Sequence, residues 1–241
     1  MPSRRRVSQE HSQISTETPR CGLIFIEGII GAGKTTNARR IVDDLGRRGL
    51  SAHVVSEGSP LLRVGQQLAH PYSPWLDVSI DGYIDRCRDS WRGFLGVQDQ
   101  GLLLVSDGLL FHGNMTDLLL MDADAAALTR YFDVVLDAIG AAQPRLILLR
   151  TRDVRASLRA TCDARGAAWE SYQLTWKLAS PYARTRRLSG FDGFVRLYED
   201  YRDACDVLAA RDALPTLRLD DDRGWPERER EVLEWTRSQV A

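Results

Sequence analysis

The sequence predicts an α/β fold in which a parallel sheet is covered by helices on both faces. Short apolar runs of strand length recur along the chain, and longer stretches with helical character separate them. These runs are continuously apolar and do not alternate with polar residues, which is typical of strands buried on both faces. Right-handed crossovers between such strands bring the loops that follow them to one edge of the sheet.

Five apolar runs are expected to form the strands: residues 21–27, 52–56, 101–106, 145–150 and 216–219. The first run, CGLIFIE, combines β-branched and aromatic residues, and Pro144 directly precedes the fourth. Gly49 ends the first expected helix, and Pro226 begins the last one, where proline is favoured. The expected helices are residues 36–48, 59–99 with a break at 70–74, 114–142, 153–165, 168–210 with interruptions at Pro181 and 190–193, and a last helix from Pro226.

The 241 residues carry a net charge of −1, from 32 basic and 33 acidic side chains. This balance favours neither a nucleic acid nor a membrane surface as a partner. No apolar run reaches the roughly 18–20 residues needed to span a bilayer. Residues 1–20 are polar and lack the apolar segment of a secretory leader, so a disordered tail is expected there. Residues 21–241 are expected to form one domain.

Four cysteines, at positions 21, 87, 162 and 205, are widely spaced and have no histidine cluster beside them. Such spacing argues against a zinc site or a disulfide framework. Free buried thiols in a reducing compartment are therefore expected, and the expected location is cytoplasmic.

Residues 28–35 (GIIGAGKT) match the pattern G-x-x-x-x-G-K-[ST] at every fixed position, between an expected strand and an expected helix. In such a loop, glycines let backbone N–H groups point at phosphate oxygens, and the helix N-terminus adds partial positive charge. Lys34 is expected to reach the β- and γ-phosphates, and the Thr35 hydroxyl to ligate Mg²⁺. The residues expected to bind the nucleotide are Gly28, Ile29, Ile30, Gly31, Ala32, Gly33, Lys34, Thr35 and Thr36.

Other sequence features narrow the class of nucleotide-binding protein. The chain has neither the N-K-x-D motif of a Ras-like GTPase nor the L-S-G-G-Q signature of a transport ATPase. Motor ATPases usually need a longer chain. These exclusions leave a small kinase with ATP as phosphoryl donor, Mg²⁺ as metal ion and a small molecule as acceptor. The sequence is compatible with either a monomer or a homodimer.

Two carboxylates end expected strands at the edge where the nucleotide loop lies. Asp107 follows the third strand, where a carboxylate holds Mg²⁺ through water, although an aspartate that caps the SDG turn is the alternative. Glu57 follows the second strand, where it can take or orient the proton of an acceptor hydroxyl. A solvated turn glutamate is the alternative for Glu57. Just past Asp107, His112 and Asn114 are placed to contact an acceptor.

The segment RTRDVRASLRATCDARG is rich in arginine and is expected to close over the transferring phosphoryl group. Guanidinium groups stabilise the negative charge that spreads over that group during transfer. Arg159 and Arg165 are the arginines expected to do so. Solvated arginines are the alternative, because the chain is arginine-rich and contains only two lysines, Lys34 and Lys177.

Together, FIEGIIGAGKTT, the SEG turn, VSDG and LLRTRDVRASLRATCDARG resemble the deoxynucleoside kinase and thymidylate kinase group. The resemblance implies a P-loop NTPase three-layer sandwich with strand order 2-3-1-4-5 and a helical lid over about residues 151–190. It implies that Glu57 is the base, that Asp107 is the acidic position after the third strand, and that Arg159 and Arg165 are lid arginines. The adenine is expected between the lid and residues 220–224.

The chain departs from that group at two positions. Gly108 stands where an arginine that contacts the substrate is normal, and Asp163 replaces a further lid arginine. A kinase for an antibiotic or another secondary metabolite is therefore one alternative to a nucleoside or nucleotide kinase. A nucleotide-binding switch that hydrolyses slowly or not at all is an alternative of another class.

Overall fold

The computed structural model describes residues 21–97 and 101–240, so the expected tail at 1–20 lies outside the described residues. Its five parallel strands form one sheet in the order β2-β3-β1-β4-β5, which confirms the expected topology. The strands are β1 (Leu23–Gly28), β2 (Ala52–Ser56), β3 (Leu103–Asp107), β4 (Arg145–Arg150) and β5 (Thr216–Asp220).

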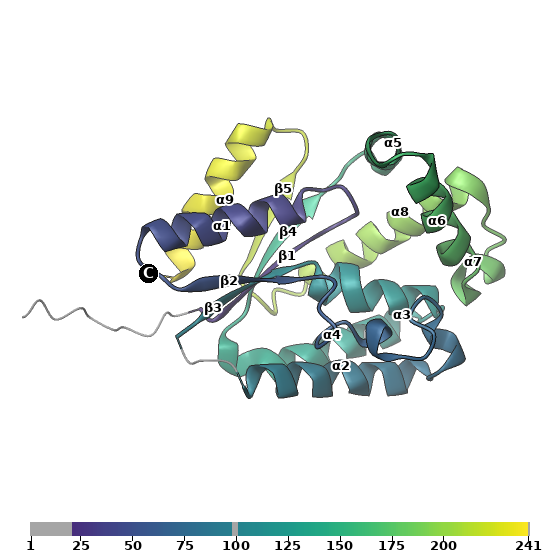
Figure 1. Cartoon of the computed structure of the whole chain (residues 1–241), viewed down its shortest axis with the longest axis horizontal. Coiled ribbons are helices and arrows are strands. Elements are labelled where there is room, and N and C mark those ends of the chain that lie inside the picture. The colour runs from purple at the N-terminus through teal and green to yellow at the C-terminus, as the bar shows by residue number, and fades with distance from the viewer. Residues whose placement is uncertain (1–20, 98–100, 241) are drawn as a thin grey trace, which may run out of the picture.

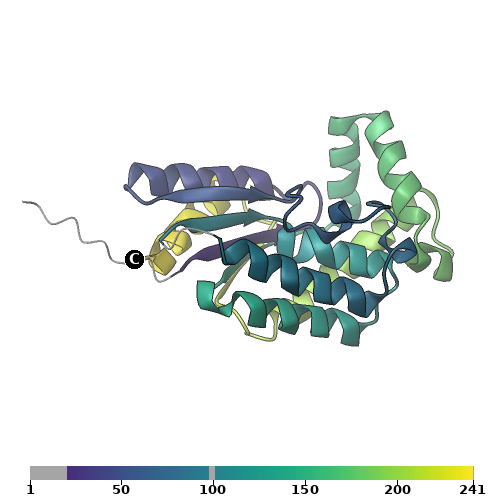
Figure 2. The same ribbon diagram turned by 60° about the horizontal axis from the view of Figure 1, so that its bottom comes forward.

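Helices cover both faces of the sheet and make a three-layer sandwich (Figures 1 and 2). On one face lie α1 (Lys34–Arg47) and α9 (Trp225–Val240), which pack on side chains such as Ile24 and Ile26 of β1. On the other face lie α2 (Ile80–Leu95), α4 (Ala125–Ile139) and α8 (Gly190–Ala209), which pack on side chains such as Leu23 and Phe25. The alternation along β1 therefore sends successive apolar residues into two separate cores.

Residues 59–79 are not mostly helical, and that expectation is wrong. The segment contains only two short 3₁₀ turns, η1 (Val64–Gln67) and η2 (Pro74–Leu76), before Ser79 caps α2. Three prolines, at positions 60, 71 and 74, explain this, because each removes a backbone donor and disfavours helix at the residue before it. The segment is held from outside by Asn114, which accepts from the Val64 N–H and donates to the Leu62 carbonyl.

The expected single helix over 114–142 is also wrong, because four helical segments occupy the region, the last of them the 3₁₀ turn η4 (Gly140–Ala142). A π-helix, η3 (Leu109–Met115), leads into α3 (Thr116–Leu120), and α4 then begins after Asp124, whose side chain caps it. Asp122, at a backbone φ of 66°, turns the chain between α3 and α4. Aspartate tolerates this left-handed conformation better than most residues do.

The segment expected to form a lid comprises α5 (Val154–Arg165), α6 (Ala167–Leu178) and α7 (Pro181–Thr185). Figure 2 shows α5 and α6 standing off the end of the sandwich as a pair. Gly166, at a φ of 88°, forms the turn between α5 and α6. The interruptions expected near 181 and 190 are present as the starts of α7 and α8.

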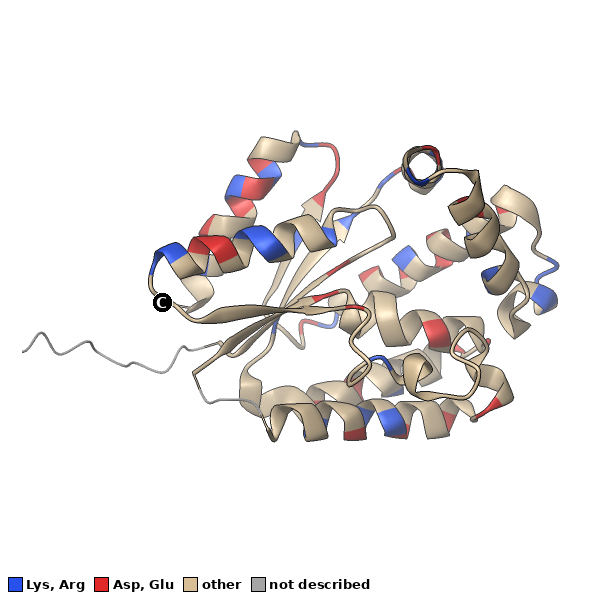
Figure 3. Ribbon diagram, in the orientation of Figure 1, with Lys and Arg blue, Asp and Glu red and all other residues tan. Residues whose placement is uncertain are grey.

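The four cysteines are free and buried, as expected. Acidic and basic residues are interspersed along α1 and α9 rather than separated by sign (Figure 3). Among residues 21–97 and 101–240, no helix combines the length and the apolar character that crossing a membrane requires.

Candidate active site

The loop between β1 and α1 has the conformation that its glycines allow. Gly31 has a φ of 82°, and a Cβ atom at this position would overlap the Thr161 hydroxyl of α5. The loop at Gly31 therefore lies directly against Thr161 of α5. Gly33 precedes Lys34, the first residue of α1, so the N-terminus of that helix lies at the end of the loop.

Lys34 is buried inside this loop. Its Nζ donates to the carbonyl oxygens of Gly28, at 3.1 Å, and of Ile29, at 3.0 Å. Burial lowers the pKa of Lys34, and the nearby carboxylates Glu57, Glu27 and Asp107 act in the opposite direction. The ammonium group is thus held at the base of the loop, beside the position where phosphate oxygens would lie.

Thr35 and Asp107 meet at the end of β3. The Thr35 hydroxyl donates to Asp107 Oδ2 at 2.7 Å, and Asp107 is only 3% exposed. Asp107 Oδ1 has no hydrogen-bond partner among the described residues. An unpartnered buried carboxylate oxygen next to a hydroxyl fits a hydrated Mg²⁺, which takes one or two protein ligands and completes its shell with water and phosphate.

The described residues contain no group of three or more His, Cys, Asp or Glu side chains placed to hold a metal ion. This agrees with the ligand set that Mg²⁺ uses beside a nucleotide, because the protein then supplies few ligands and the phosphates supply others. Thr35 and Asp107, the two residues expected to hold the metal, are therefore brought together.

A cavity of about 440 Å³ lies in front of the loop. Glu57 and His112 form one wall, and Arg165, Trp169 and Gln173 of the α5–α6 segment form another. The cavity lining consists of Ile30, Gly31, Gly33, Lys34, Thr35, Thr36, Glu57, His112, Arg165, Trp169 and Gln173. Lys34, Thr35, Glu57 and Arg165, predicted from sequence, thus share one space, and Asp107 adjoins it through Thr35.

His112 lies beside Glu57 in this wall, with 3.5 Å between His112 Nε2 and Glu57 Oε2. Burial and the cations Lys34, Lys177, Arg63 and Arg165 lower the pKa of His112 well below its ordinary value. The imidazole is therefore neutral at neutral pH. Glu57, whose side chain is 47% exposed, keeps its carboxylate open to the cavity.

The two lid arginines differ in where they point. Arg165 lines the cavity and lies over the Trp169 ring at 5.0 Å. Arg159 instead donates to Glu170, at 3.1 and 3.3 Å, and lies 3.8 Å over the ring of Phe191. The structure therefore brings Arg165 to the loop and holds Arg159 in the packing of α5 against α6 and α8.

Substitution of the two arginines is expected to separate these roles. Arg165→Gln is expected to lower kcat by about 10- to 100-fold, because it removes a cation that lines the cavity in front of the loop, where a transferred phosphoryl group would lie. Arg159→Gln is expected to change kcat by less than about threefold and to lower Tm instead, through the lost pair with Glu170. Steady-state kinetics and thermal unfolding on both variants measure this, and equal losses of kcat would contradict it.

Gly108 has a structural reason to lack a side chain. Its φ is 72°, and a Cβ atom there would lie 2.9 Å from Lys34 Cε and 3.3 Å from Glu57 Oε2. A larger residue would push Lys34 or Glu57 out of place. The glycine at position 108 is therefore explained by its left-handed backbone and its contact with Lys34, and an arginine there would strain the backbone and force these side chains to shift.

Glu27 is a residue that sequence reasoning missed. It is the last residue but one of β1, is fully buried, and accepts hydrogen bonds from the backbone N–H groups of Leu110, at 2.7 Å, and His112, at 2.9 Å. It thereby holds the start of the π-helix that carries His112. An acidic residue within the apolar run LIFIEG was the signal that could have identified it.

A second cavity of about 200 Å³ lies on the other side of the loop. It is bounded by Ala32, by Thr151 and Ser157 at the start of α5, and by Asp221 and Trp225 after β5. Arg228 lies 5.4 Å from the centroid of the Trp225 ring. This cavity adjoins the region between the lid and residues 220–224, where the adenine is expected.

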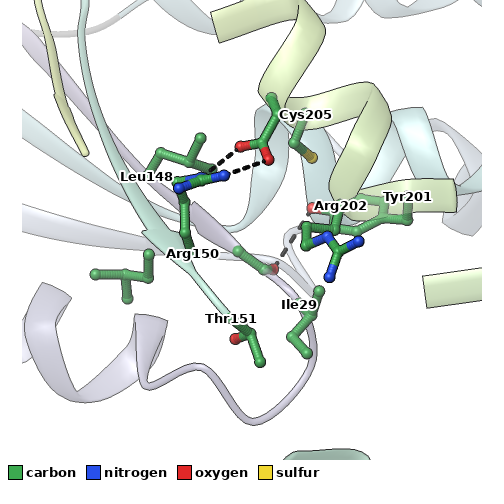
Figure 4. A pocket seen from close by; sticks show the side chains of 10 residues that line it. Ile29, Leu148, Arg150, Thr151, Tyr201, Arg202 and Cys205 are labelled. Carbon is green, nitrogen blue, oxygen red and sulfur yellow. Dashed lines mark hydrogen bonds and ion pairs between the residues drawn. The ribbon is translucent and has the colours of Figure 1, made fainter. Parts of the chain in front are cut away.

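Behind the loop, β4 and α8 are joined by Arg150 (Figure 4). Its guanidinium donates twice to Asp206, at 2.8 and 2.9 Å, and once to Asp220 at 2.7 Å. The void beside it measures about 10 Å³, room for one water at most. This end of α8 therefore supports the loop and offers no ligand site.

No family model and no curated protein matches the chain. Among solved structures, a mutant of the APS kinase CysC from Mycobacterium tuberculosis is 15% identical, with 90% of this chain and 96% of that chain covered and a TM-score of 0.42. The same kinase in complex with AMPPNP and APS is 17% identical, with 90% and 97% covered and a TM-score of 0.45. A protein named APE1195 is 13% identical, with 93% and 99% covered and a TM-score of 0.48.

Sequence identities of 13% to 17% do not indicate that this chain and these proteins share a substrate. The resemblance to the deoxynucleoside kinase and thymidylate kinase group therefore remains an expectation from sequence. The strand order and the loop that joins β1 to α1 are those of a P-loop NTPase fold.

Proposed function

We propose that the protein is an ATP- and Mg²⁺-dependent phosphotransferase that acts on a hydroxyl or phosphate of a small, nucleoside- or nucleotide-like molecule. One observation carries the proposal. The phosphate-binding loop and the polar side chains of Glu57, His112 and Gln173 line the same cavity of about 440 Å³. A space of this size has room for an acceptor beside the donor phosphates.

The donor would be held by the chain's own backbone and by Lys34. The loop amides and the N-terminus of α1 bind the phosphate oxygens, and Lys34 neutralises part of the charge on the transferring group. Thr35 directly, and Asp107 through water, would hold Mg²⁺. When bound, the ion neutralises charge on the phosphates. Arg165 faces the same space from α5.

The acceptor would be oriented by Glu57. Its carboxylate lies open to the cavity and takes the proton of the attacking hydroxyl. The acceptor oxygen bonds to the γ-phosphorus, the bond to the bridging oxygen breaks, and ADP leaves. The α5–α6 pair covers the cavity and excludes water, which would otherwise compete as acceptor.

Asp107→Asn is expected to raise the Mg²⁺ concentration for half-maximal activity by about 10- to 100-fold, because a neutral amide replaces the anionic group that orients the ion's shell. The measurement is a Mg²⁺ titration at a fixed nucleotide concentration. Asp203→Asn, at an exposed position of α8, serves as the matched control. An unchanged Mg²⁺ requirement would exclude Asp107 from the metal site.

The proposed function is tested by an acceptor screen read by mass spectrometry. The protein is incubated with Mg–ATP and pooled nucleosides, nucleotides, sugars and hydroxylated antibiotics, beside a Lys34→Met variant. A compound that gains one phosphate only with the wild-type protein supports the proposal. Nucleotide binding without any phosphorylated compound would overturn it in favour of a nucleotide-binding switch.

The screen also separates the two kinase hypotheses. Phosphorylation confined to an antibiotic would favour a kinase for secondary metabolites, and growth protection of cells that express the chain would support this. Phosphorylation of nucleosides or nucleotides would favour the substrate class that the sequence resemblance implies.

A further inference from the structure

The α6–α8 side of the cavity contains a buried lysine that the proposed mechanism does not use. Lys177, one of only two lysines in the chain, is 4% exposed. Its Nζ donates to Gln173 Oε1 at 2.7 Å and lies 3.7 Å from the centroid of the Trp176 ring. Within the described residues it forms no ion pair with a carboxylate. A buried ammonium group without a counter-ion is costly, so the fold alone does not account for it.

The rings of Trp176 and Tyr198 lie near Lys177, and these rings and that of His112 carry polar atoms that are unpartnered within the described residues. The Tyr198 hydroxyl, the Trp176 indole N–H and His112 Nδ1 are buried, and the described residues supply none of them with a hydrogen-bond partner. Tyr198 stacks on His112 with ring centroids 6.3 Å apart, and its own centroid lies 6.0 Å from Lys177 Nζ. The cluster is therefore one local site with an excess of hydrogen-bond donors.

The charge around this cluster is positive. The cations that act on His112 are Lys34, Lys177, Arg63 and Arg165. Asp117 already pairs with Arg63, at 3.1 Å, and Lys34 belongs to the donor site. Arg165 lines the cavity where the transferring group would lie, so Lys177 remains for another anion. Gln173, which accepts from Lys177, lines the main cavity, so the cluster lies directly behind its wall.

We propose that the acceptor carries an anionic group, a phosphate monoester, which binds at the α6 wall of the cavity, where Gln173 lines the cavity and Lys177 lies directly behind it, away from the oxygen that receives the new phosphate. A phosphate at this wall supplies the counter-charge for Lys177 and hydrogen-bond partners for the Gln173 amide. This inference rests on the proposed function and narrows it to a phosphorylated acceptor with a separate accepting group.

Because Lys177 can lose its proton near neutral pH, anion binding at this site is expected to depend on pH. Burial and the charge of Arg63 lower the pKa of Lys177 to about 7, against the opposing effect of Asp117 and Glu57. Tyr198 on α8, His112 on the π-helix and Arg165 on α5 also face this region, and the neutral His112 does not titrate near pH 7. A bound anion favours the charged lysine, so the affinity for the anion is expected to fall as the pH rises from about 7 to about 8.

The test measures binding with the donor site filled. The protein is saturated with Mg–AMPPNP and titrated calorimetrically with matched pairs: thymidine and its 5′-monophosphate, adenosine and its 5′-monophosphate, and ribose and ribose 5-phosphate. In at least one pair, the phosphorylated probe is expected to bind about 10- to 100-fold more tightly than the neutral one. The Lys177→Met variant is expected to lose that preference.

Two controls accompany the titration. Arg196→Gln removes an exposed arginine of α8 and is expected to keep the preference. Thermal unfolding of Lys177→Met confirms that the variant is folded. Proton uptake on binding at about pH 8 is expected in the wild-type protein and is expected to be smaller in Lys177→Met, measured in two buffers of different ionisation enthalpy.

The inference is overturned if no phosphorylated probe binds, if the neutral and phosphorylated members of each pair bind equally, or if Lys177→Met keeps the preference. These outcomes are distinct from failure of the proposed function. If phosphorylated probes bind through Lys177 but Mg–ATP yields no phosphorylated product, the kinase proposal fails and the anion site stands. If the wild-type protein and Lys177→Met phosphorylate neutral acceptors equally well, the kinase proposal stands and the anion site fails.

Discussion

Replacement of Lys34 by methionine is expected to lower kcat by about 100- to 1000-fold, the loss typical of removing one group that stabilises charge in the transition state. Methionine keeps the apolar stem that packs beside Gly108 and removes only the ammonium group. The positive charge that Lys34 holds at the base of the loop would then be absent when negative charge develops on the transferring phosphoryl group.

The measurement is single-turnover phosphorylation of the acceptor found by the screen, with calorimetric nucleotide binding beside it. Lys177→Met, which removes the only other lysine, is the matched comparison, and it is expected to change acceptor KM more than kcat. A Lys34→Met variant with wild-type kcat would exclude Lys34 from phosphoryl transfer.

Replacement of Glu27 by glutamine is expected to change the dependence of stability on pH. Burial raises the pKa of Glu27 from 4.5 to about 7, against the hydrogen bonds from the backbone of the π-helix and the charge of Lys34. As the pH rises from about 4.5 to about 7, the unfolded chain loses this proton and the folded chain keeps it. The free energy of unfolding is therefore expected to fall by about 3 kcal/mol over this range from Glu27 alone, and to level off above it.

Glutamine cannot ionise, so Glu27→Gln is expected to lack this fall. Its single amide oxygen serves only one of the N–H groups of Leu110 and His112, so the variant is expected to be about 1–3 kcal/mol less stable at pH 4.5. The two stability curves should therefore converge or cross near pH 7. Urea unfolding across this range measures both, with Glu234→Gln at an exposed position of α9 as control. Parallel curves for wild type and Glu27→Gln would contradict the assignment.

The strands and the nucleotide loop were predictable because their signals are local. Apolar runs of four to seven residues mark the strands within about two residues at each end, and the glycine and lysine spacing of residues 28–35 places the loop between β1 and α1. The prolines at 60, 71 and 74 exclude a helix over residues 59–79 and are a local signal, but the conformation that the segment takes instead depends on Asn114, which is distant in sequence. A single-sequence pattern has no access to such a contact.

Position 159 illustrates the same limit within the site. Arg159 and Arg165 lie on one helix, and their spacing alone does not say which of them faces the loop. Because α5 packs against α6, Arg159 forms an ion pair with Glu170, whereas Arg165 lines the cavity. Likewise, Trp225 approaches Gly33 only because β5 and α9 lie beside the start of α1.

The sequence by itself determined the parallel α/β architecture, the phosphate-binding loop, and the carboxylates at the ends of β2 and β3, since each follows from residue types at short spacing. The tertiary structure alone decided that Glu27 supports the π-helix, that a side chain at position 108 would displace Lys34 or Glu57, and that Lys177 is buried with no carboxylate paired to it among the described residues. Those features depend on which distant segments are close in space, and burial then sets the energy of each charge.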